Sequence, residues 1–159
     1  MIVTVYRLLC LAGIVVSVYG KLVALYKKQD SSYRAACDFG SAFSCSTALT
    51  SEYANGFGII GPLLGHDHFL NISNSVYGIF FYAALFVIGG ARSQLMRKLN
   101  VLLGAVSCAM SVYLAYILYA ILHDFCLVCV TIYVVNILLF ILAIVQLRRL
   151  TAKDPRHTR

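Results

Sequence analysis

The sequence predicts an all-α membrane protein, a bundle of four transmembrane helices with a lumenal cap loop that contains short helical segments. Hydrophobic residues make up 61% of the 159 residues and charged residues only 12%, and the mean hydropathy is +0.85. A soluble domain needs more polar side chains to cover its surface, and a disordered chain has far fewer apolar ones. The apolar residues are grouped in four runs of membrane-spanning length. We therefore expect one membrane domain over residues 1–159.

Each apolar run is close to the ~17–25 residues that span a bilayer as an α-helix. No proline interrupts the runs, because Pro62 and Pro155 fall in connecting or terminal segments. The expected spans cover about residues 3–26, 76–91, 101–122 and 125–147. The first run could instead be a signal peptide, with Arg7 before the apolar stretch and Gly20 as a cleavage site. An uncleaved span is favoured because the run is long for a signal peptide and lacks a clear small-x-small site.

The basic residues orient the helices in the membrane. Four spans place both termini and the short second connection on one side. The basic residues of that side are Arg7, Arg92, Arg97, Lys98, Arg148, Arg149, Lys153, Arg156 and Arg159. The other side holds Lys21, Lys27, Lys28 and Arg34 together with Asp30, Asp38, Glu52, Asp67 and Asp124. The positive-inside rule then predicts cytoplasmic termini and a lumenal or external cap loop over about residues 27–75. This topology accounts for the net charge of +7, so we expect no nucleic-acid partner.

The cap loop is more apolar than an ordinary connection. Glycines alternate in it with large apolar side chains such as Phe57, Leu63 and Phe69. One interpretation is a packed loop that satisfies its own backbone hydrogen bonds. The other is a partly helical cap that touches the membrane surface and closes a lipidic pocket.

Four of the six cysteines form two pairs on the predicted lumenal side. Cys126 and Cys129 make a C-x-x-C motif at the start of the fourth span, and Cys37 and Cys45 lie in the cap loop. A zinc site, two static disulfides and a redox relay are the alternatives. The spacing of Cys37 and Cys45 is outside the usual zinc pattern, so we expect no metal. A C-x-x-C at a helix N-terminus favours redox chemistry, because the helix dipole lowers a thiol pKa.

Other polar residues are placed near this motif by helical spacing and membrane depth. Positions +3 and +7 from Cys126 are Cys129 and Tyr133, so we expect both sulfurs and the phenol to share one stripe of the fourth helix. Asn74 opens the second span, where it either caps the helix or binds a ligand carbonyl. The remaining candidates have structural interpretations: Asn136 and Thr131 tie helices together, Cys10 and Cys108 pack, and His66 and His68 lie in solvated loop.

Several strings of the chain match a known family over nearly its whole length, from about Tyr6 to Leu147. They are Arg34-Ala35-Ala36-Cys37-Asp38, Ser44-Cys45-Ser46, Gly56-Phe57-Gly58, Asn71-Ile72-Ser73-Asn74-Ser75, Ser111-Val112-Tyr113-Leu114-Ala115-Tyr116-Ile117-Leu118 and Asp124-Phe125-Cys126-Leu127-Val128-Cys129-Val130-Thr131-Ile132-Tyr133. On these strings the sequence closely resembles the vitamin K epoxide reductases. The resemblance implies a four-helix enzyme of the endoplasmic reticulum membrane that reduces vitamin K 2,3-epoxide to the quinone and the quinone to the hydroquinone.

The resemblance also implies a role for each cysteine. The thiolate of Cys129 attacks the substrate, and Cys126 resolves the adduct by forming the Cys126–Cys129 disulfide. Cys45 then attacks Cys126, and Cys37 releases it as the Cys37–Cys45 disulfide. No tightly bound cofactor is implied, since the electrons come through redox-active disulfides from a lumenal thioredoxin-like protein or a small thiol.

The substrate site implied by the resemblance is polar at two positions and apolar elsewhere. Asn74 and Tyr133 hydrogen-bond the substrate oxygens, where charge builds as the ring is reduced. The implied pocket lining is Phe57, Leu49, Tyr53, Tyr77 and Phe81, residues that ordinary packing would also explain. Coumarin-type anticoagulants are the implied inhibitors.

The chain departs from the coumarin-sensitive enzyme of the family at two places. Its tyrosine lies in Ile132-Tyr133-Val134 instead of Thr-Tyr-Ala, and Tyr53 occupies the position of a loop tryptophan. The valine resembles the vertebrate paralogue, so the sequence does not decide between the two or fix the anticoagulant affinity. A quinone-linked disulfide-generating oxidase of the same fold is the main alternative function. A tetraspan scaffold is less favoured, because the chain has no tryptophan and carries a C-x-x-C.

Overall fold

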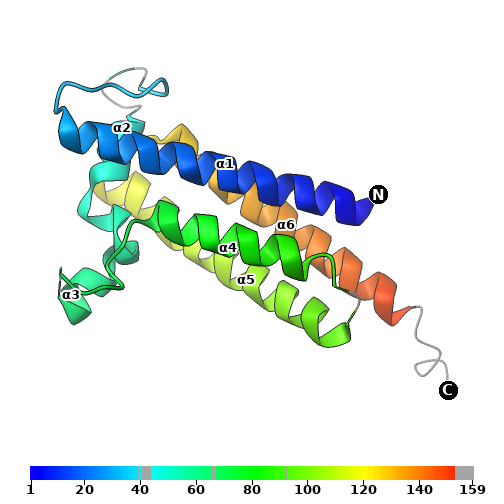
Figure 1. Cartoon of the computed structure of the whole chain (residues 1–159). Helices are drawn as coiled ribbons and strands as arrows, with labels where there is room; N and C mark the ends of the chain where they lie inside the picture. The colour runs from blue at the N-terminus through cyan, green and yellow to red at the C-terminus, as the bar shows by residue number, and fades with distance from the viewer. Residues whose placement is uncertain (39, 41–43, 66, 92, 153–159) are drawn as a thin grey trace.

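In the computed structural model the long helices run side by side as an elongated bundle (Figure 1). The structure describes residues 1–38, 40, 44–65, 67–91 and 93–152, so His66, Arg92, Lys153, Arg156 and Arg159 lie outside the described residues. The long helices are α1 (Ile2–Gln29), α4 (Asn74–Ile88), α5 (Gln94–Tyr116) and α6 (Leu127–Thr151). A π-helical turn, η3 (Ile117–Ile121), continues α5.

The segment between α1 and α4, here called the cap segment (residues 30–73), contains the short elements. These are α2 (Cys45–Thr50), α3 (Ile60–Leu64) and the 3-10 turns η1 (Glu52–Ala54) and η2 (Gly56–Gly58). They gather at one end of the bundle, the cap end, while the start of α1 and the end of α6 lie at the other, the terminal end (Figure 1). Short helical segments were predicted in this part of the chain, and they are present.

The prediction of an all-helical protein with apolar helices of membrane-spanning length is confirmed in outline. Within the described residues, α1, α5 extended by η3, and α6 are long and apolar enough to cross a membrane. The apolar helix α4 has only 15 residues, or about 22 Å at ~1.5 Å per residue. Three helices extend beyond the predicted spans, because α1 continues to Gln29, α5 already begins at Gln94 and α6 continues to Thr151, whereas α4 ends at Ile88, before the predicted end at residue 91.

Small residues bring α1 and α4 close together. A Cβ atom on Gly13 of α1 would lie 2.8 Å from the ring of Tyr82, and one on Gly78 of α4 would lie 2.6 Å from the Ser17 hydroxyl oxygen. Such close backbone approach is the usual way in which helices associate within a membrane, where dispersion contacts replace the hydrophobic effect. The other main contacts are those of α6 with α5 and with α1.

Asn136 ties three helices together in the middle of the bundle. Its amide oxygen accepts a hydrogen bond of 2.7 Å from the Tyr82 hydroxyl of α4, and its amide nitrogen donates one of 2.9 Å to the Ser111 hydroxyl of α5. The predicted role of Asn136 is therefore confirmed. The same prediction is wrong for Thr131, whose hydroxyl donates to the Leu127 carbonyl of its own helix and so joins no second helix.

Buried apolar residues form two clusters along the bundle axis. The cluster nearer the terminal end includes Cys10, which is fully buried in agreement with its predicted packing role, together with Tyr6, Tyr82, Leu85, Val135, Leu139 and Ala143. Cys108, by contrast, is partly exposed. The cluster at the cap end contains both members of the loop cysteine pair and Cys126. The two cysteine pairs therefore meet in one packed core.

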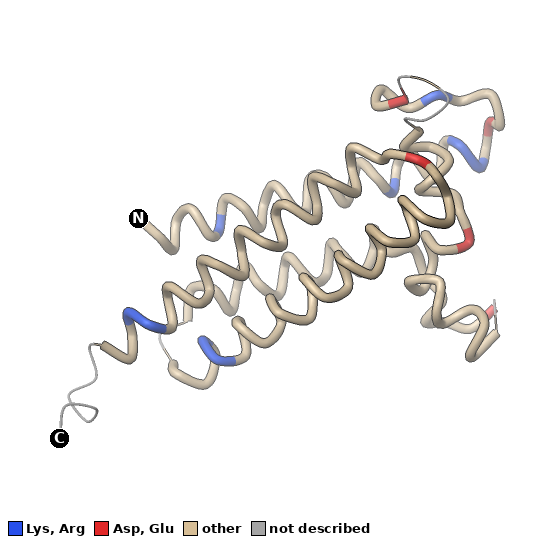
Figure 2. Tube along the Cα trace, turned by 180° about the vertical axis from the view of Figure 1, so that it is seen from behind, with Lys and Arg blue, Asp and Glu red and all other residues tan. Residues whose placement is uncertain are grey.

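The charged residues divide between the two ends. All the acidic residues within the described part of the chain, Asp30, Asp38, Glu52, Asp67 and Asp124, lie at the cap end (Figure 2). Basic residues occur at both ends. The acidic residues of the described chain are therefore confined to the cap end, whereas the basic residues are not confined to either end.

Replacing Tyr82 by Phe or Asn136 by Ala should destabilise the bundle. Tyr82→Phe leaves the buried amide oxygen of Asn136 without its donor, and Asn136→Ala removes both interhelical bonds, at a cost of about 1–2 kcal/mol. We expect the thermal unfolding midpoint in detergent to fall for both variants. Thr131→Ala is the matched control, because its hydroxyl bond stays within one helix, and it should leave the midpoint nearly unchanged. An equal decrease in all three variants would contradict the assigned role of Asn136.

Candidate active site

An apolar cavity of about 320 Å³ opens between the cap segment and the bundle. Residues of α1, α2, α4, α5 and α6 contribute to its wall, and so does the part of the cap segment from Ser51 to Phe57. All seven residues predicted to bind substrate line it: Asn74, Tyr133, Phe57, Leu49, Tyr53, Tyr77 and Phe81. This volume and lining suit a flat, apolar small molecule.

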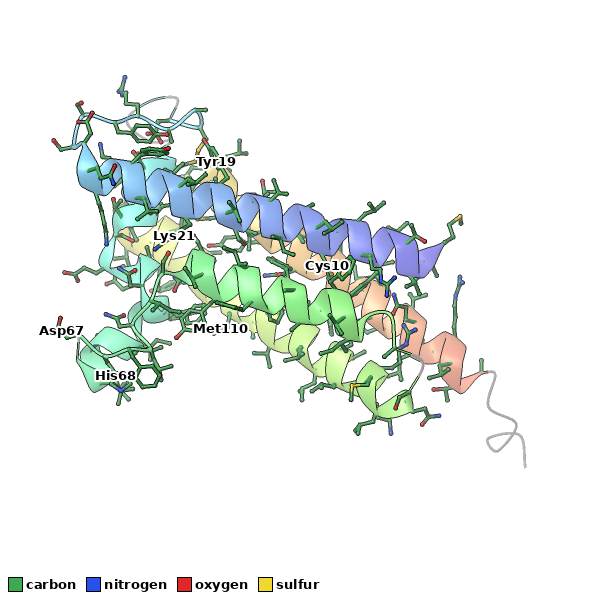
Figure 3. The ribbon with its side chains drawn as sticks, in the orientation of Figure 1. Cys10, Tyr19, Lys21, Asp67, His68 and Met110 are labelled. Carbon is green, nitrogen blue, oxygen red and sulfur yellow. A yellow bond between two sulfur atoms is a disulfide. The ribbon has the colours of Figure 1, made fainter. Side chains whose placement is uncertain are left out.

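Part of the cavity wall is formed by bundle residues that were not predicted from the sequence. Met110 of α5 is one such residue and lies towards the cap end of that helix (Figure 3). The polar residues in this part of the wall are Ser17, Tyr82, Ser107, Ser111 and Asn136. Helical spacing from Tyr133 would have found Asn136, three residues further along α6, as a lining residue. By contrast, His68 lies at the tip of the cap segment, away from the cavity (Figure 3).

The two cysteines of the C-x-x-C motif occupy different environments. Cys129 lies in the first turn of α6 and lines the cavity together with Tyr133. Cys126 is the N-cap residue of α6, with an extended backbone, and its sulfur accepts a hydrogen bond of 3.4 Å from the Cys129 amide. It is fully buried and does not line the cavity. Cys129 and Tyr133 of the predicted stripe therefore both line the cavity, whereas Cys126 precedes the helix as its N-cap residue and does not line the cavity.

The loop cysteines form the Cys37–Cys45 disulfide, whereas Cys126 and Cys129 are free thiols in this structure. The disulfide packs in the same buried cluster as Cys126, with Val23 of α1 and Leu118 of η3 beside it. Tyr19 of α1 covers this cluster from the side (Figure 3). Cys45 is fully buried, and Cys37 is 7% exposed. Three redox-capable sulfurs are thus shielded from water within one cluster.

Asp38 lies directly beside the disulfide. Its role at this site was not predicted from the sequence. One of its carboxylate oxygens accepts from the Ser46 amide at 3.1 Å, and the other accepts from the Ser46 hydroxyl at 2.7 Å and the Ala35 amide at 2.9 Å. Partial burial disfavours the charged carboxylate, but these hydrogen bonds outweigh it and hold the pKa of Asp38 below its usual value. Asp38, Cys37 and Cys45 are near enough to share a metal ion, but sulfurs joined in a disulfide provide no thiolate ligand.

Asn74 fastens the cap segment to α4. It is the first residue of that helix and follows the N-cap residue Ser73, so the interpretation of Asn74 as the helix cap is wrong. Its amide oxygen accepts a 2.8 Å bond from the Phe57 amide, and its amide nitrogen donates a 2.7 Å bond to the Tyr53 carbonyl. An amide nitrogen carries two protons, so one remains available to a ligand in the cavity that Asn74 lines.

The bond to Phe57 stabilises an unusual turn. Gly56, Phe57 and Gly58 have φ values of 51°, 58° and 70°, a conformation that glycine adopts freely but that strains a phenylalanine. The Phe57 ring stacks on Tyr77 of α4, with the ring centroids 5.1 Å apart. The Tyr77 hydroxyl in turn donates to the Leu70 carbonyl of the cap segment at 2.6 Å. The cap segment and α4 are therefore joined by a small polar and aromatic network that closes the cavity.

Together, the fold and the cysteine geometry define a class: helical membrane proteins in which two cysteine pairs meet beside an apolar cavity. Within this class, the chain belongs to the vitamin K epoxide reductase family, whose profile matches residues 4–144. The chain is 44% identical to "Vitamin K epoxide reductase complex subunit 1" of Mus musculus over 135 residues, which are 85% of this chain and 84% of that protein. It is 40% identical to the protein of the same name from Rattus norvegicus over 147 residues, covering 92% and 91% of the two chains.

Replacing Asn74 by Asp should loosen the cap segment, although the two side chains have nearly the same shape. A carboxylate still accepts from the Phe57 amide, but it cannot donate to the Tyr53 carbonyl and instead repels it. We expect faster limited proteolysis within residues 44–65 and an unfolding midpoint lower than that of the wild type. Asn55→Asp is the matched control, because Asn55 is the N-cap residue of η2 and its side chain makes no cap hydrogen bond to that turn. Equal proteolysis rates in wild type and Asn74→Asp would contradict this attachment.

Proposed function

We propose that the chain reduces vitamin K 2,3-epoxide to the quinone and the quinone to the hydroquinone, by thiolate attack and a relay between two dithiols. The observation that carries this proposal is the division of the C-x-x-C motif. Cys126 belongs to the buried cluster of the Cys37–Cys45 disulfide and does not line the cavity, whereas Cys129 packs against that cluster and also lines the cavity. This arrangement supports a scheme in which Cys129 meets the quinone and Cys126 exchanges with the loop pair.

The epoxide reaction balances with the thiols of this chain. The Cys129 thiolate attacks a ring carbon of the epoxide, so that a carbon–sulfur bond forms and a carbon–oxygen bond breaks. The Cys126 thiolate then attacks the Cys129 sulfur, forming the disulfide and leaving the electron pair of the broken carbon–sulfur bond on the ring. Loss of the remaining oxygen as water yields the quinone. Reduction of the quinone uses two thiols in the same way and yields the hydroquinone and a disulfide.

Asn74 and Tyr133 would supply hydrogen bonds to the substrate oxygens as negative charge develops there. Both residues line the cavity, and Asn74 keeps one amide proton beyond its bond to the cap segment. In a cavity with little polar surface, such donors act with little competition from water. Leu49, Tyr53, Phe57, Tyr77 and Phe81 would form the apolar wall around the ring, and a coumarin-type inhibitor would occupy the same space.

The proposed setting is the endoplasmic reticulum membrane, with α4 as a fourth span and both termini in the cytoplasm. The cap segment and both cysteine pairs would then face the lumen, an oxidising compartment in which disulfides persist. The basic residues at the terminal end of the bundle support this orientation. Electrons would come from a lumenal thioredoxin-like protein or a small thiol, and no tightly bound cofactor is required.

Replacing Cys129 by Ala should abolish turnover of vitamin K epoxide by the purified protein in detergent with dithiothreitol. Replacing Cys126 by Ser should let the substrate adduct persist on Cys129, where intact-protein mass spectrometry would detect it. Cys108→Ser is the matched control, because Cys108 lies on α5 and does not line the cavity, and it should retain activity. Normal turnover by Cys129→Ala would refute the mechanism. Oxidised protein substrates without any hydroquinone product would favour the quinone-linked oxidase instead.

Replacing Tyr133 by Phe should lower kcat on the order of 10²–10³-fold for both the epoxide and the quinone, because only the donor to the developing oxyanion is lost. The ring remains, so the unfolding midpoint should change little. Tyr113→Phe makes the same substitution on α5 outside the cavity and should keep the wild-type rate. If Tyr133→Phe also turns over at the wild-type rate, the phenol is only a packing residue.

A further inference from the structure

Asp38 connects the two backbone segments that carry the loop cysteines. On the Cys37 side its carboxylate accepts from the Ala35 amide, and on the Cys45 side it accepts from both the amide and the hydroxyl of Ser46. Its oxygen and the two disulfide sulfurs all lie within 4.8 Å of one another. The carboxylate therefore makes a second, non-covalent link across the same gap that the disulfide closes.

We propose that Asp38 is a positioning residue for the loop cysteine pair, holding Cys37 against the first turn of α2 while the disulfide is open. This inference rests on the proposed relay, in which that disulfide opens and closes once in every cycle. Cys45 is the first residue of α2, so a carboxylate bound to the amide of the next residue fixes the position of its sulfur. Bonds to a charged acceptor are stronger than neutral ones, which suits a link that must replace a covalent bond.

The relay itself shows when such a link is needed. An external dithiol reduces the Cys37–Cys45 disulfide with two electrons and two protons and becomes a disulfide itself. The Cys45 thiolate then attacks the Cys126 sulfur of an oxidised C-x-x-C pair, forming a 45–126 bond and releasing Cys129 as thiolate. The Cys37 thiolate finally attacks Cys45, so that the 37–45 bond forms and Cys126 leaves as thiolate. During these steps Cys37 stays near Cys45 only through non-covalent contacts.

The strength of the link can be measured as the equilibrium constant for forming the Cys37–Cys45 disulfide. A thiol held close to its partner has a high effective concentration, so the disulfide resists reduction. The side chain of Asn has one acceptor oxygen, whereas the carboxylate of Asp38 has two. In Asp38→Asn the NH₂ group replaces the second oxygen and faces an N–H or O–H donor, from which it cannot accept a hydrogen bond. Asp38→Asn should therefore make the disulfide easier to reduce.

The test is to equilibrate the full-length protein in detergent with a series of dithiothreitol redox buffers, without vitamin K. Alkylation and peptide mass spectrometry then give the oxidised fraction of Cys37 and Cys45. We expect the equilibrium constant to fall about tenfold in Asp38→Asn, which corresponds to about 30 mV for a two-electron couple. Ser46→Ala removes one of the three hydrogen bonds and should lower it by a smaller factor.

Asp30→Asn is the matched control. The Asp30 carboxylate also accepts from a serine amide at 2.8 Å and from that serine's hydroxyl at 2.6 Å, but both bonds go to Ser32 in its own exposed turn and do not link the segments that carry Cys37 and Cys45. It should leave the equilibrium constant unchanged. A constant within about twofold of wild type in Asp38→Asn would overturn the inference, since a tenfold change is the expected size. If that variant does not fold, an unchanged constant in Ser46→Ala overturns it.

The same assay separates this inference from the proposed function, because it contains no substrate. An unshifted equilibrium in a variant that still reduces vitamin K epoxide would refute the role of Asp38 alone. A shifted equilibrium in a protein whose wild type does not turn over the epoxide would refute the proposed function alone. A purely structural role would lower the unfolding midpoint without moving the redox equilibrium measured well below it.

Discussion

The amide group of Asn74 holds the cap segment over the cavity by accepting one backbone hydrogen bond and donating another. Its acceptor fixes the amide of Phe57, a residue whose left-handed backbone is costly for any side chain. Once this turn is fixed, the Phe57 ring reaches Tyr77 of α4 and the Tyr53 side chain lines the same cavity. The position of the cavity roof therefore depends on a side chain at the start of a bundle helix. Only an amide can meet both backbone groups, because a carboxylate cannot donate and a hydroxyl is too short to replace it.

The first turn of α6 places the two cysteines of the C-x-x-C motif in different environments. Cys126 precedes the helix and points into the buried cluster, whereas Cys129 lies within the helix and lines the cavity. A helix N-terminus also has free amide groups and a partial positive charge, and the Cys129 amide already bonds the Cys126 sulfur. The thiol that would resolve an adduct thus stays one turn from the thiol that would form it.

The sequence was sufficient for features that depend on local pattern, and insufficient for those that depend on how distant segments meet. Hydropathy predicted the helices, and spacing along α6 placed Cys129 and Tyr133 on one face. That Cys126 lies outside the cavity wall was not predicted, because spacing cannot tell where a helix begins and Cys126 is the N-cap residue of α6. The contacts of Asn74 and Asp38 could not be predicted, since their partners are backbone groups whose positions are fixed only by the folded cap segment. The cysteine motif and the cavity-lining residues were therefore recognisable from type and spacing, but the contacts of Asn74 and Asp38 were not.

Burial gives the proposed relay its direction. Cys37 is the only member of the Cys37–Cys45 disulfide with any exposed surface, so an external dithiol in the proposed scheme would attack it first and release Cys45 as the thiolate. Cys45 is fully buried in the cluster that contains Cys126, which makes Cys126 its accessible partner. Cys126 in turn contacts the amide of Cys129, the residue that reaches the cavity. Each exchange thus moves the electrons from the water-accessible end of the chain of sulfurs towards the apolar cavity. Because the intermediate sulfurs are shielded, a small thiol in solution would compete poorly for them in the proposed scheme, and the electrons would pass on to the substrate.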